Sequence, residues 1–283
     1  FTQAMDLRPN SDEGKVEALA AFGTADESIY QDMINATKID KKQLSINYDV
    51  KLIEPFYDIN WLKRQRNRAG DENFCASIQT YLEDIMVSYL NIAYEKYPTN
   101  NLCLSGGVAA NIIMSLAIYE RTSFKSIYVY PAMGDDGLAI GSAILTAINL
   151  GQDIRWLKDF SMPYFGDLFS REQVKKVLDD FDNISFEDIG DDWPEKAAIS
   201  VSEGKICALF HGQMEFGPRA LGNRSIIANP MLEDTRQKIN STIKRRPSYQ
   251  PFCPSILEEE RVRLFKDSFS HKHMAIAFRM KEE

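Results

Sequence analysis

Apolar residues recur at helical spacing along several stretches of the chain. The clearest pattern opens at Asp71 and places Phe74, Ile78 and Leu82 on one face before it ends ahead of Pro98. The stretch 26–57 has no clear period and is predicted to be irregular. Shorter patterns of the same kind predict further helices at residues 16–22, 108–119, 138–150, 171–181, 193–203 and 232–243.

Short apolar runs alternate with these helices and predict strands. Two of the runs lead into a glycine-containing turn and then into a helix, which is the pattern of parallel strands joined by helical connections. We therefore predict an α/β fold in which ligands gather at the carboxyl ends of the strands. The runs lie at 102–104, 126–130, 184–186, 206–210 and 225–228, with another strand expected within 249–257.

The two turns carry the first candidate chemistry. Gly106 and Gly107 follow a strand and precede a helix, where free N–H groups favour phosphate, although a glycine pair after a strand occurs in many folds. Asp135 and Asp136 occupy the second turn and are candidate metal ligands. The alternative is that one aspartate caps the following helix. We expect one to cap and the other to point toward a ligand.

Residues 212–230 form the most unusual stretch of the chain, with three glycines, two prolines and two arginines. Arg219 and Arg224 supply planar, permanently charged groups suited to carboxylate or phosphate oxygens. The alternative is a structural loop whose arginines pair with surface carboxylates. Because the loop follows a strand and lies downstream of two phosphate-type turns, we favour a site for a small anion.

Composition narrows the class of protein. The chain has 283 residues, 44% hydrophobic residues and a net charge of −8, which predicts two globular domains and argues against nucleic acid as a bulk electrostatic partner. It contains no apolar run long enough for a membrane span and no visible signal peptide.

The four cysteines are widely spaced, and Cys103 and Cys207 lie inside apolar runs. Buried free thiols in a reducing compartment are therefore expected, which favours a cytoplasmic protein. The chain opens at Phe1 rather than methionine and ends on a charged tripeptide. We expect a fragment of a longer protein.

Four blocks occur in an order and spacing that resemble the NodU/CmcH family of O-carbamoyltransferases, and the opening 12–15 fits as well. The most specific block is Glu-Phe-Gly-Pro-Arg-Ala-Leu-Gly-Asn-Arg-Ser. The blocks are Ser105–Asn111, Pro131–Gly141, Met214–Ser225 and Lys244–Pro254.

The resemblance implies two domains and a two-stage reaction. Residues 1–160 would form the C-terminal lobe of an actin/Hsp70-like ATPase (ASKHA) domain, and residues 161–283 most of a YrdC-like domain, cut short at its C-terminus. Carbamoyl phosphate and ATP would form carbamoyl-adenylate in the YrdC-like domain. The carbamoyl group would then pass to a hydroxyl of a sugar or natural product near a divalent metal, expected to be iron(II). Members of this family are often dimeric, so a homodimer is a further expectation.

The resemblance also assigns roles to residues at matching positions. Asp135 matches the aspartate ligand of the metal. The anion or phosphate groups would be held by Arg219, Arg224 and Lys244, with Arg246 assisting. Nucleotide contacts would come from Glu13, Gly106, Gly107, Asn111, Asn223 and Ser225.

The chain departs from the family pattern in two places. The family's histidine metal ligands lie in an N-terminal lobe that this chain lacks, so the fragment alone is expected to be inactive in overall transfer. Near the end, Pro247 and Gln250 stand where a glutamate and an arginine are expected. A neutral amide cannot replace a bidentate guanidinium, which leaves a weakened carbamoyl-phosphate site or a different anion as alternatives.

Two other functions stay open at this point. One is an ATP-dependent phosphotransferase on the same actin-like fold, although such kinases have no YrdC-like partner domain. The other is a non-catalytic nucleotide-binding module, which Gln250 and the missing lobe would suit.

Overall fold

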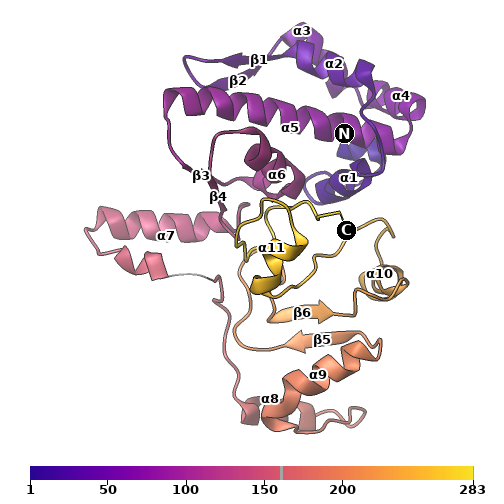
Figure 1. The fold of residues 1–283 in the computed structure, drawn as a ribbon, viewed down its shortest axis with the longest axis vertical. Helices are drawn as coiled ribbons and strands as arrows, with labels where there is room; N and C mark the ends of the chain where they lie inside the picture. Colours follow the sequence, from indigo (N-terminus) through magenta and orange to yellow (C-terminus); the bar gives the residue numbers. More distant parts are fainter. Residues whose placement is uncertain (160–161, 283) are drawn as a thin grey trace. The chain divides into compact units, whose positions relative to one another are not determined.

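A computed structural model describes residues 1–159 and 162–282. The chain divides into two compact units, the first formed by residues 1–134 with 249–283 and the second by residues 135–248 (Figure 1). The expected domain boundary at residue 160 falls on residues outside the described ones. That boundary therefore stays a prediction.

The first unit is mainly helical. Its helices surround α5, the long helix in Figure 1. The elements are η1 (Thr2–Met5), α1 (Glu13–Ala20), α2 (Glu27–Ala36), β1 (Thr37–Asp40), β2 (Ser45–Tyr48), α3 (Val50–Ile53), η2 (Glu54–Tyr57), α4 (Ile59–Ala69), α5 (Asp71–Lys96), β3 (Asn101–Leu104), η3 (Gly107–Ala110), α6 (Ile112–Arg121), β4 (Ser126–Val129), η7 (Glu258–Glu260) and α11 (Arg261–Leu264).

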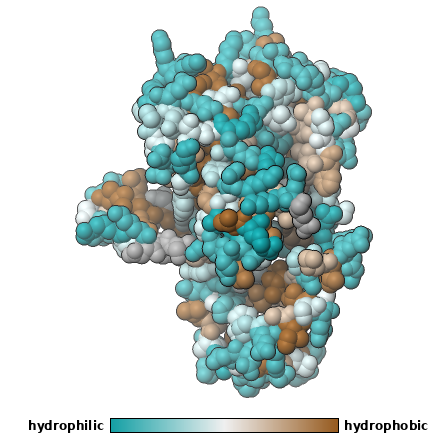
Figure 2. All heavy atoms as spheres, in the orientation of Figure 1, coloured by the Kyte–Doolittle hydropathy of each residue, from teal (hydrophilic) through white to brown (hydrophobic). Residues whose placement is uncertain are grey.

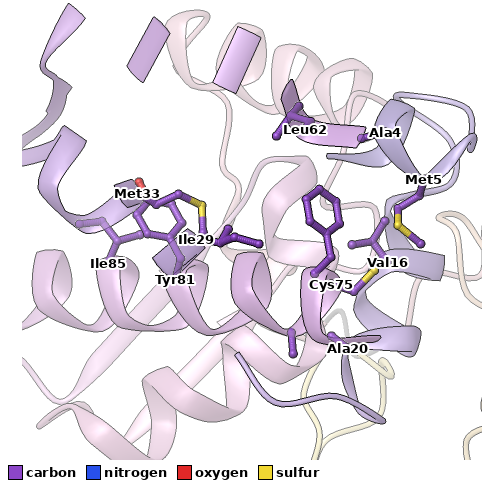
Figure 3. Close-up of a cluster of buried hydrophobic side chains, with 12 residues drawn as sticks. Ala4, Met5, Val16, Ala20, Ile29, Met33, Leu62, Cys75, Tyr81 and Ile85 are labelled. Carbon is purple, nitrogen blue, oxygen red and sulfur yellow. The ribbon is translucent and has the colours of Figure 1, made fainter. Parts of the chain in front are cut away.

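Helix α5 confirms the prediction made from its apolar period. Gly70, with φ of 84°, precedes its first residue, and the acidic pair Asp71 and Glu72 lies in its first turn, where the helix dipole favours negative charge. Phe74 and Cys75 are fully buried in a cluster with residues of α1 and α2 (Figure 3). The helix thus forms the centre of the first unit's core.

The expectation of an irregular stretch at 26–57 is wrong. Asp26 caps α2 by accepting a hydrogen bond from the backbone N–H of Ile29, at 3.1 Å. Ile29, Met33 and Ala36 are at most 3% exposed and share one helical face. This period extends over only ten residues before the β1–β2 hairpin begins, which is too short to stand out among polar neighbours.

The parallel strand pair predicted from the two strand–turn–helix runs is confirmed. Strands β3 and β4 pair in parallel, with Leu102 opposite Ile127. The turns that follow them meet, because the N–H of Gly106 donates to the carbonyl oxygen of Met133 at 2.8 Å. Both turns therefore lie at the carboxyl ends of neighbouring strands. The α/β class that the sequence predicted is confirmed at the level of a mixed α/β protein, in which helix exceeds strand over the described residues.

The C-terminal segment belongs to the first unit. Arg279 forms two hydrogen bonds with the carboxylate of Glu120 in α6, at 2.6 and 2.9 Å, and the Phe269 ring packs edge-on against Tyr119. Within the described residues no strand occurs in 249–257, so that prediction is wrong. The prolines there remove backbone donors that a strand would need.

His271 is held in this segment in its neutral form. Its Nε2 accepts a hydrogen bond from the N–H of the fully buried Ala275, at 3.1 Å. Burial, followed by the charge of His273, lowers the pKa of His271 from 6.5 to about 4. Protonation would both charge a desolvated ring and remove the acceptor.

We expect acid to destabilise the first unit through His271. The folded-state pKa lies below the unfolded value, so the unfolded state binds the proton first as the pH falls. The free energy of unfolding should therefore decline between pH 6.5 and about 4. Urea denaturation across this range would measure it. His271→Gln should flatten the decline and His273→Gln should retain most of it; an equally steep decline in His271→Gln would contradict this account.

The second unit has little buried apolar surface: of its described residues, Ile239 is the buried hydrophobic one. The strands described in this unit form the antiparallel pair β5–β6, with Phe210 opposite Arg224. The elements are α7 (Gly137–Asn149), η4 (Arg155–Asp159), α8 (Arg171–Asp179), η5 (Gly190–Asp192), α9 (Trp193–Ser202), β5 (Cys207–Phe210), β6 (Arg224–Ile227), α10 (Thr235–Lys238) and the π-helix η6 (Ile239–Lys244).

Two predictions in this unit need correction. Residues 184–186 form no strand, because no neighbouring strand pairs with them among the described residues. The helix expected at 232–243 is instead a short α-helix that continues as a π-helix, and a left-handed residue, Arg245, with φ of 48°, ends it.

Helix α7 exposes much of its apolar surface. Leu138, Leu145 and Ile148 are 67%, 58% and 48% exposed, and Figure 2 shows the brown apolar surface of this helix. Over the described residues, every helix is too short or too polar to cross a bilayer.

The prediction of buried thiols holds only for Cys75, because Cys103 and Cys253 are exposed and Cys207 is half-buried.

Candidate functional site

The predicted site residues divide between the two units. Glu13, Gly106, Gly107 and Asn111 belong to the first unit. The second unit holds Asp135, Arg219, Asn223, Arg224, Ser225, Lys244 and Arg246. Different elements build each group.

In the first unit, α1 and the N-terminus of α6 come together. Glu17 of α1 accepts a hydrogen bond from the N–H of Ile113 at 3.2 Å. Glu13 lies one turn earlier on the same helix face, and its carboxylate accepts the N–H of Asn10 at 2.6 Å. The structure therefore places Glu13 one helical turn from the residue that contacts the N-terminus of α6. It also shows that a protein carboxylate already binds the N-terminus of α6.

The Gly106–Gly107 turn is open. Gly106 has φ of 99°, a conformation that favours glycine, and both glycines are exposed with no atom within 4 Å of the place a Cβ would occupy. A ligand could therefore approach the backbone closely there. Its phosphate affinity stays a prediction.

Asn111 is engaged by other protein groups. Its Oδ1 caps α6 by accepting the N–H of Met114 at 2.8 Å, and its Nδ2 donates to Oε1 of Gln79 at 2.7 Å. Gln79, which is 9% exposed, donates in return to Asn111 and also to Glu83. Burial raises the pKa of Glu83, and the hydrogen bond from Gln79 opposes that rise. Asn111 thus has a clear structural role, and its contact with a nucleotide stays a prediction.

The second turn differs from the expected arrangement at its capping position. Asp136 precedes α7 but forms no side-chain capping bond, so the expectation that one aspartate caps is wrong for this residue. Asp135 is exposed, and its carbonyl oxygen accepts the N–H of Leu138 at 3.0 Å. Among the described residues there is no group of three or more His, Cys, Asp and Glu side chains able to hold a metal. These residues therefore do not fit a complete metal site.

The long loop between β5 and β6 is organised around one buried carboxylate, that of Glu215, which is 8% exposed. Its Oε1 accepts the backbone N–H groups of Leu221 at 2.7 Å, Asn223 at 2.7 Å and Arg224 at 3.2 Å. Burial acts to raise the pKa of Glu215, but the backbone hydrogen bonds outweigh it and hold the pKa below its ordinary value. The carboxylate is therefore ionised at neutral pH.

Arg224 is oriented by both strands of the hairpin. Its guanidinium stacks on the Phe210 ring, 3.5 Å from the ring centroid. Nη1 donates to three carbonyl oxygens, those of His211 at 2.9 Å, Gly212 at 3.2 Å and Asn223 at 3.0 Å. Over the described residues Nε and Nη2 form no hydrogen bond, so this edge of the fork can bind an anion.

The other loop residues support the same conformation. Asn223 donates from Nδ2 to the carbonyl oxygen of Gln213 at 2.6 Å, and Ser225 Oγ accepts the N–H of Gly222 at 3.0 Å. The Tyr164 hydroxyl donates to the carbonyl oxygen of Leu221 at 2.8 Å. Arg219 is half-buried in the same loop. The structure thus places Arg219 and Asn223 in the loop, and Arg224 and Ser225 at the start of β6, which follows it.

The basic cluster after η6 is built differently. Lys244 is exposed, whereas Arg246 is half-buried, and Nε of Arg246 donates to Oδ1 of the fully buried Asn240 at 2.7 Å. Burial lowers the pKa of Arg246. Of the two residues that depart from the family pattern, Gln250 belongs to the first unit, whereas Pro247 belongs to the second unit with the Arg219–Arg224 loop.

Sequence reasoning missed three organising residues: Glu215, Gln79 and Asn240. Glu215 stands inside the most specific block, four residues before Arg219. A carboxylate close to several glycines and far from any lysine can accept hydrogen bonds from backbone N–H groups, and that pattern could have indicated the role of Glu215. Gln79 and Asn240 gave no such signal, because each occupies a helix pattern without a distinctive neighbour.

Comparison with known proteins identifies the family. A family model described as Carbamoyltransferase N-terminus matches residues 1–144, and one described as Carbamoyltransferase C-terminus matches residues 198–283. The resemblance inferred from the motifs is confirmed.

Three relatives place the chain more closely. It is 54% identical to an uncharacterized protein of Methanocaldococcus jannaschii, over 100% of this chain and 47% of that protein. It is 29% identical to the 3'-hydroxymethylcephem-O-carbamoyltransferase of Streptomyces clavuligerus, over 96% of this chain and 49% of that protein. It is 26% identical to nodulation protein U of Bradyrhizobium diazoefficiens, over 92% of this chain and 46% of that protein. The chain spans about half the length of these relatives. Because both family models match it, the chain belongs to the carbamoyltransferase family.

Proposed function

We propose that the protein carrying this chain is an ATP-dependent O-carbamoyltransferase. It takes a carbamoyl group from carbamoyl phosphate, activates it as carbamoyl-adenylate and transfers it to a hydroxyl of a small molecule such as a sugar or natural product. The first half of the chain would be the second lobe of an actin/Hsp70-like domain and the second half a YrdC-like domain.

One observation carries this proposal. A relative whose name states O-carbamoyl transfer aligns with 96% of the chain, which includes both strand-end turns and the Arg219–Arg224 loop. The loop geometry supports it, since Arg224 presents one edge of a fixed guanidinium. A preorganised cation of this kind suits an acyl phosphate or a phosphate leaving group.

The proposed reaction has three steps: cleavage of carbamoyl phosphate, formation of carbamoyl-adenylate and transfer to the acceptor. Water cleaves carbamoyl phosphate to carbamate and phosphate, and a carbamate oxygen attacks the α-phosphorus of ATP and releases pyrophosphate. The acceptor hydroxyl then attacks the carbamoyl carbon, loses its proton and releases AMP. Arg219 and Arg224 would bind phosphate oxygens, with Lys244 and Arg246 assisting. The Gly106–Gly107 turn would receive the nucleotide in the transfer step.

An iron(II) ion near Asp135 would supply a Lewis acid for the transfer step, but the described residues do not form a complete site for it. No step assigned to this chain therefore uses the metal. A cytoplasmic location and a homodimer belong to the same proposal.

Isotope exchange tests the first half-reaction. The natural protein that carries this chain would be incubated with ATP, carbamoyl phosphate and radiolabelled pyrophosphate. We expect label to enter ATP only when carbamoyl phosphate is present, because exchange requires reversible formation of carbamoyl-adenylate. ATP binding without exchange would instead indicate a nucleotide-binding module, and phosphate transfer to an added alcohol would indicate a phosphotransferase. Either result would overturn the proposal.

A further inference from the structure

Glu215 occupies a position that an external anion would otherwise take. Three backbone N–H groups, from Leu221, Asn223 and Arg224, converge on its carboxylate. Clustered N–H groups in a turn form a concave anion-binding arrangement. Here the protein's own side chain fills it, and the second oxygen, Oε2, also accepts the N–H of Arg224 at 3.2 Å.

This arrangement decides which groups in the loop can bind a ligand. The three N–H groups are not available to phosphate while Glu215 is in place. Among the described residues, Nε and Nη2 of Arg224 form no hydrogen bond, so they remain as side-chain donors next to this cluster. An anion at this end of the loop would therefore be held by the Arg224 guanidinium rather than by these three N–H groups.

Glu215 also fixes where those guanidinium groups lie. Its bonds hold the backbone at residues 221–224, directly before and within the first residue of β6. Arg224 is anchored by its N–H to Glu215 and by its Nη1 to the opposite end of the loop. Removing the carboxylate would release one of these two anchors and leave buried donors without an acceptor.

We propose that Glu215 is a positioning residue, whose carboxylate fills the backbone N–H cluster of the 212–223 loop and orients Arg224 toward the bound anion. The inference rests on the proposed function only in naming that anion as carbamoyl phosphate. Glu215 itself does not touch the substrate.

Glu215→Gln is the first test, with the exposed Glu233→Gln as its matched control. An amide keeps the shape but loses the charge and turns one acceptor into a donor. We expect the KM for carbamoyl phosphate in pyrophosphate exchange to rise about tenfold, because orientation of a binding group is lost. The kcat should change by about twofold or less, since the affected contact is made in the ground state. Glu233→Gln should change neither. An active Glu215→Gln variant with unchanged KM would overturn the proposal.

Chemical rescue separates positioning from general loss of structure. In Glu215→Ala, the emptied N–H cluster should accept a small carboxylate. Added formate or acetate should then lower the raised KM, and chloride at equal ionic strength should not. Equal responses to formate and chloride would count against the proposal.

A measurement without substrate keeps the inference distinct from the proposed function. Amide hydrogen exchange at Leu221, Asn223 and Arg224 should accelerate in Glu215→Gln and stay unchanged in Glu233→Gln. If the unmodified protein shows no carbamoyl-phosphate-dependent exchange, the proposed function fails while this measurement still decides the role of Glu215. Unchanged amide exchange would refute that role. If Glu215→Gln does not fold, Glu215→Asp takes its place, because its side chain is one methylene shorter and keeps the carboxylate. The same two measurements apply to it: the KM for carbamoyl phosphate and the amide exchange at Leu221, Asn223 and Arg224.

Discussion

Arg224→Ala should lower carbamoyl-phosphate-dependent pyrophosphate exchange at subsaturating carbamoyl phosphate about 100-fold or more, because it removes the charged partner of the bound anion. Alanine also deletes the stack on Phe210 and the three carbonyl bonds of Nη1. The effect should therefore combine lost anion binding with a loosened loop. Exchange kinetics at varied carbamoyl phosphate would measure both kcat and KM.

Arg224→Lys distinguishes the two contributions. Lysine retains the positive charge but cannot supply a planar fork that binds carbonyls on one edge and an anion on the other. We expect Arg224→Lys to recover only a small part of the exchange rate. The control is Arg236→Ala, at an exposed position of α10, which should change the rate by about twofold or less. Full exchange in Arg224→Ala would remove this residue from the site.

Phe74→Ala should have the largest effect on the stability of the first unit. The ring is fully buried in α5 and lies 5.0 Å, centroid to centroid, from the ring of Phe1. Truncating a buried phenylalanine costs about 3–5 kcal/mol, because transfer energy is lost and a cavity remains. The buried cluster that contains Phe74 draws on several helices, so the core cannot close around the gap by moving one of them.

Unfolding of the first unit can be followed separately. Trp61 packs edge-on against Phe56 in this unit, with ring centroids 4.9 Å apart. Urea denaturation would be monitored by its fluorescence, with Trp156 and Trp193 replaced by Phe. The matched control is Phe22→Ala, whose ring is 60% exposed and whose loss should cost about 0.5 kcal/mol or less. Equal midpoints for Phe74→Ala and Phe22→Ala would show that Phe74 does not carry the core.

Elements with a long or regular local pattern could be predicted from the sequence. Helix α5 repeats its apolar face over 26 residues, and β3 and β4 are each followed by a glycine turn and a helix. These patterns depend on residues that are close together in the chain, and the sequence shows such residues directly. The family could be recognised for a similar reason, since its motifs are contiguous blocks.

Features that depend on a distant partner could not be predicted. The side chain of Asn111 pairs with that of Gln79, 32 residues earlier. In the C-terminal segment, Arg279 pairs with Glu120, 159 residues away. Such pairs form only after the chain has brought two elements together, and either member alone has many alternative partners.

The sequence by itself determined the carbamoyltransferase family, the parallel β3–β4 pair and the grouping of Arg219, Asn223, Arg224 and Ser225 in one short stretch, because each follows from residues close together in the chain. Only the tertiary structure decided how the loop before β6 is held. The folded backbone brings three N–H groups to one carboxylate, that of Glu215, so an external anion does not occupy them. The physical reason is that N–H groups point where the backbone path directs them, and that path is fixed by contacts across the whole hairpin.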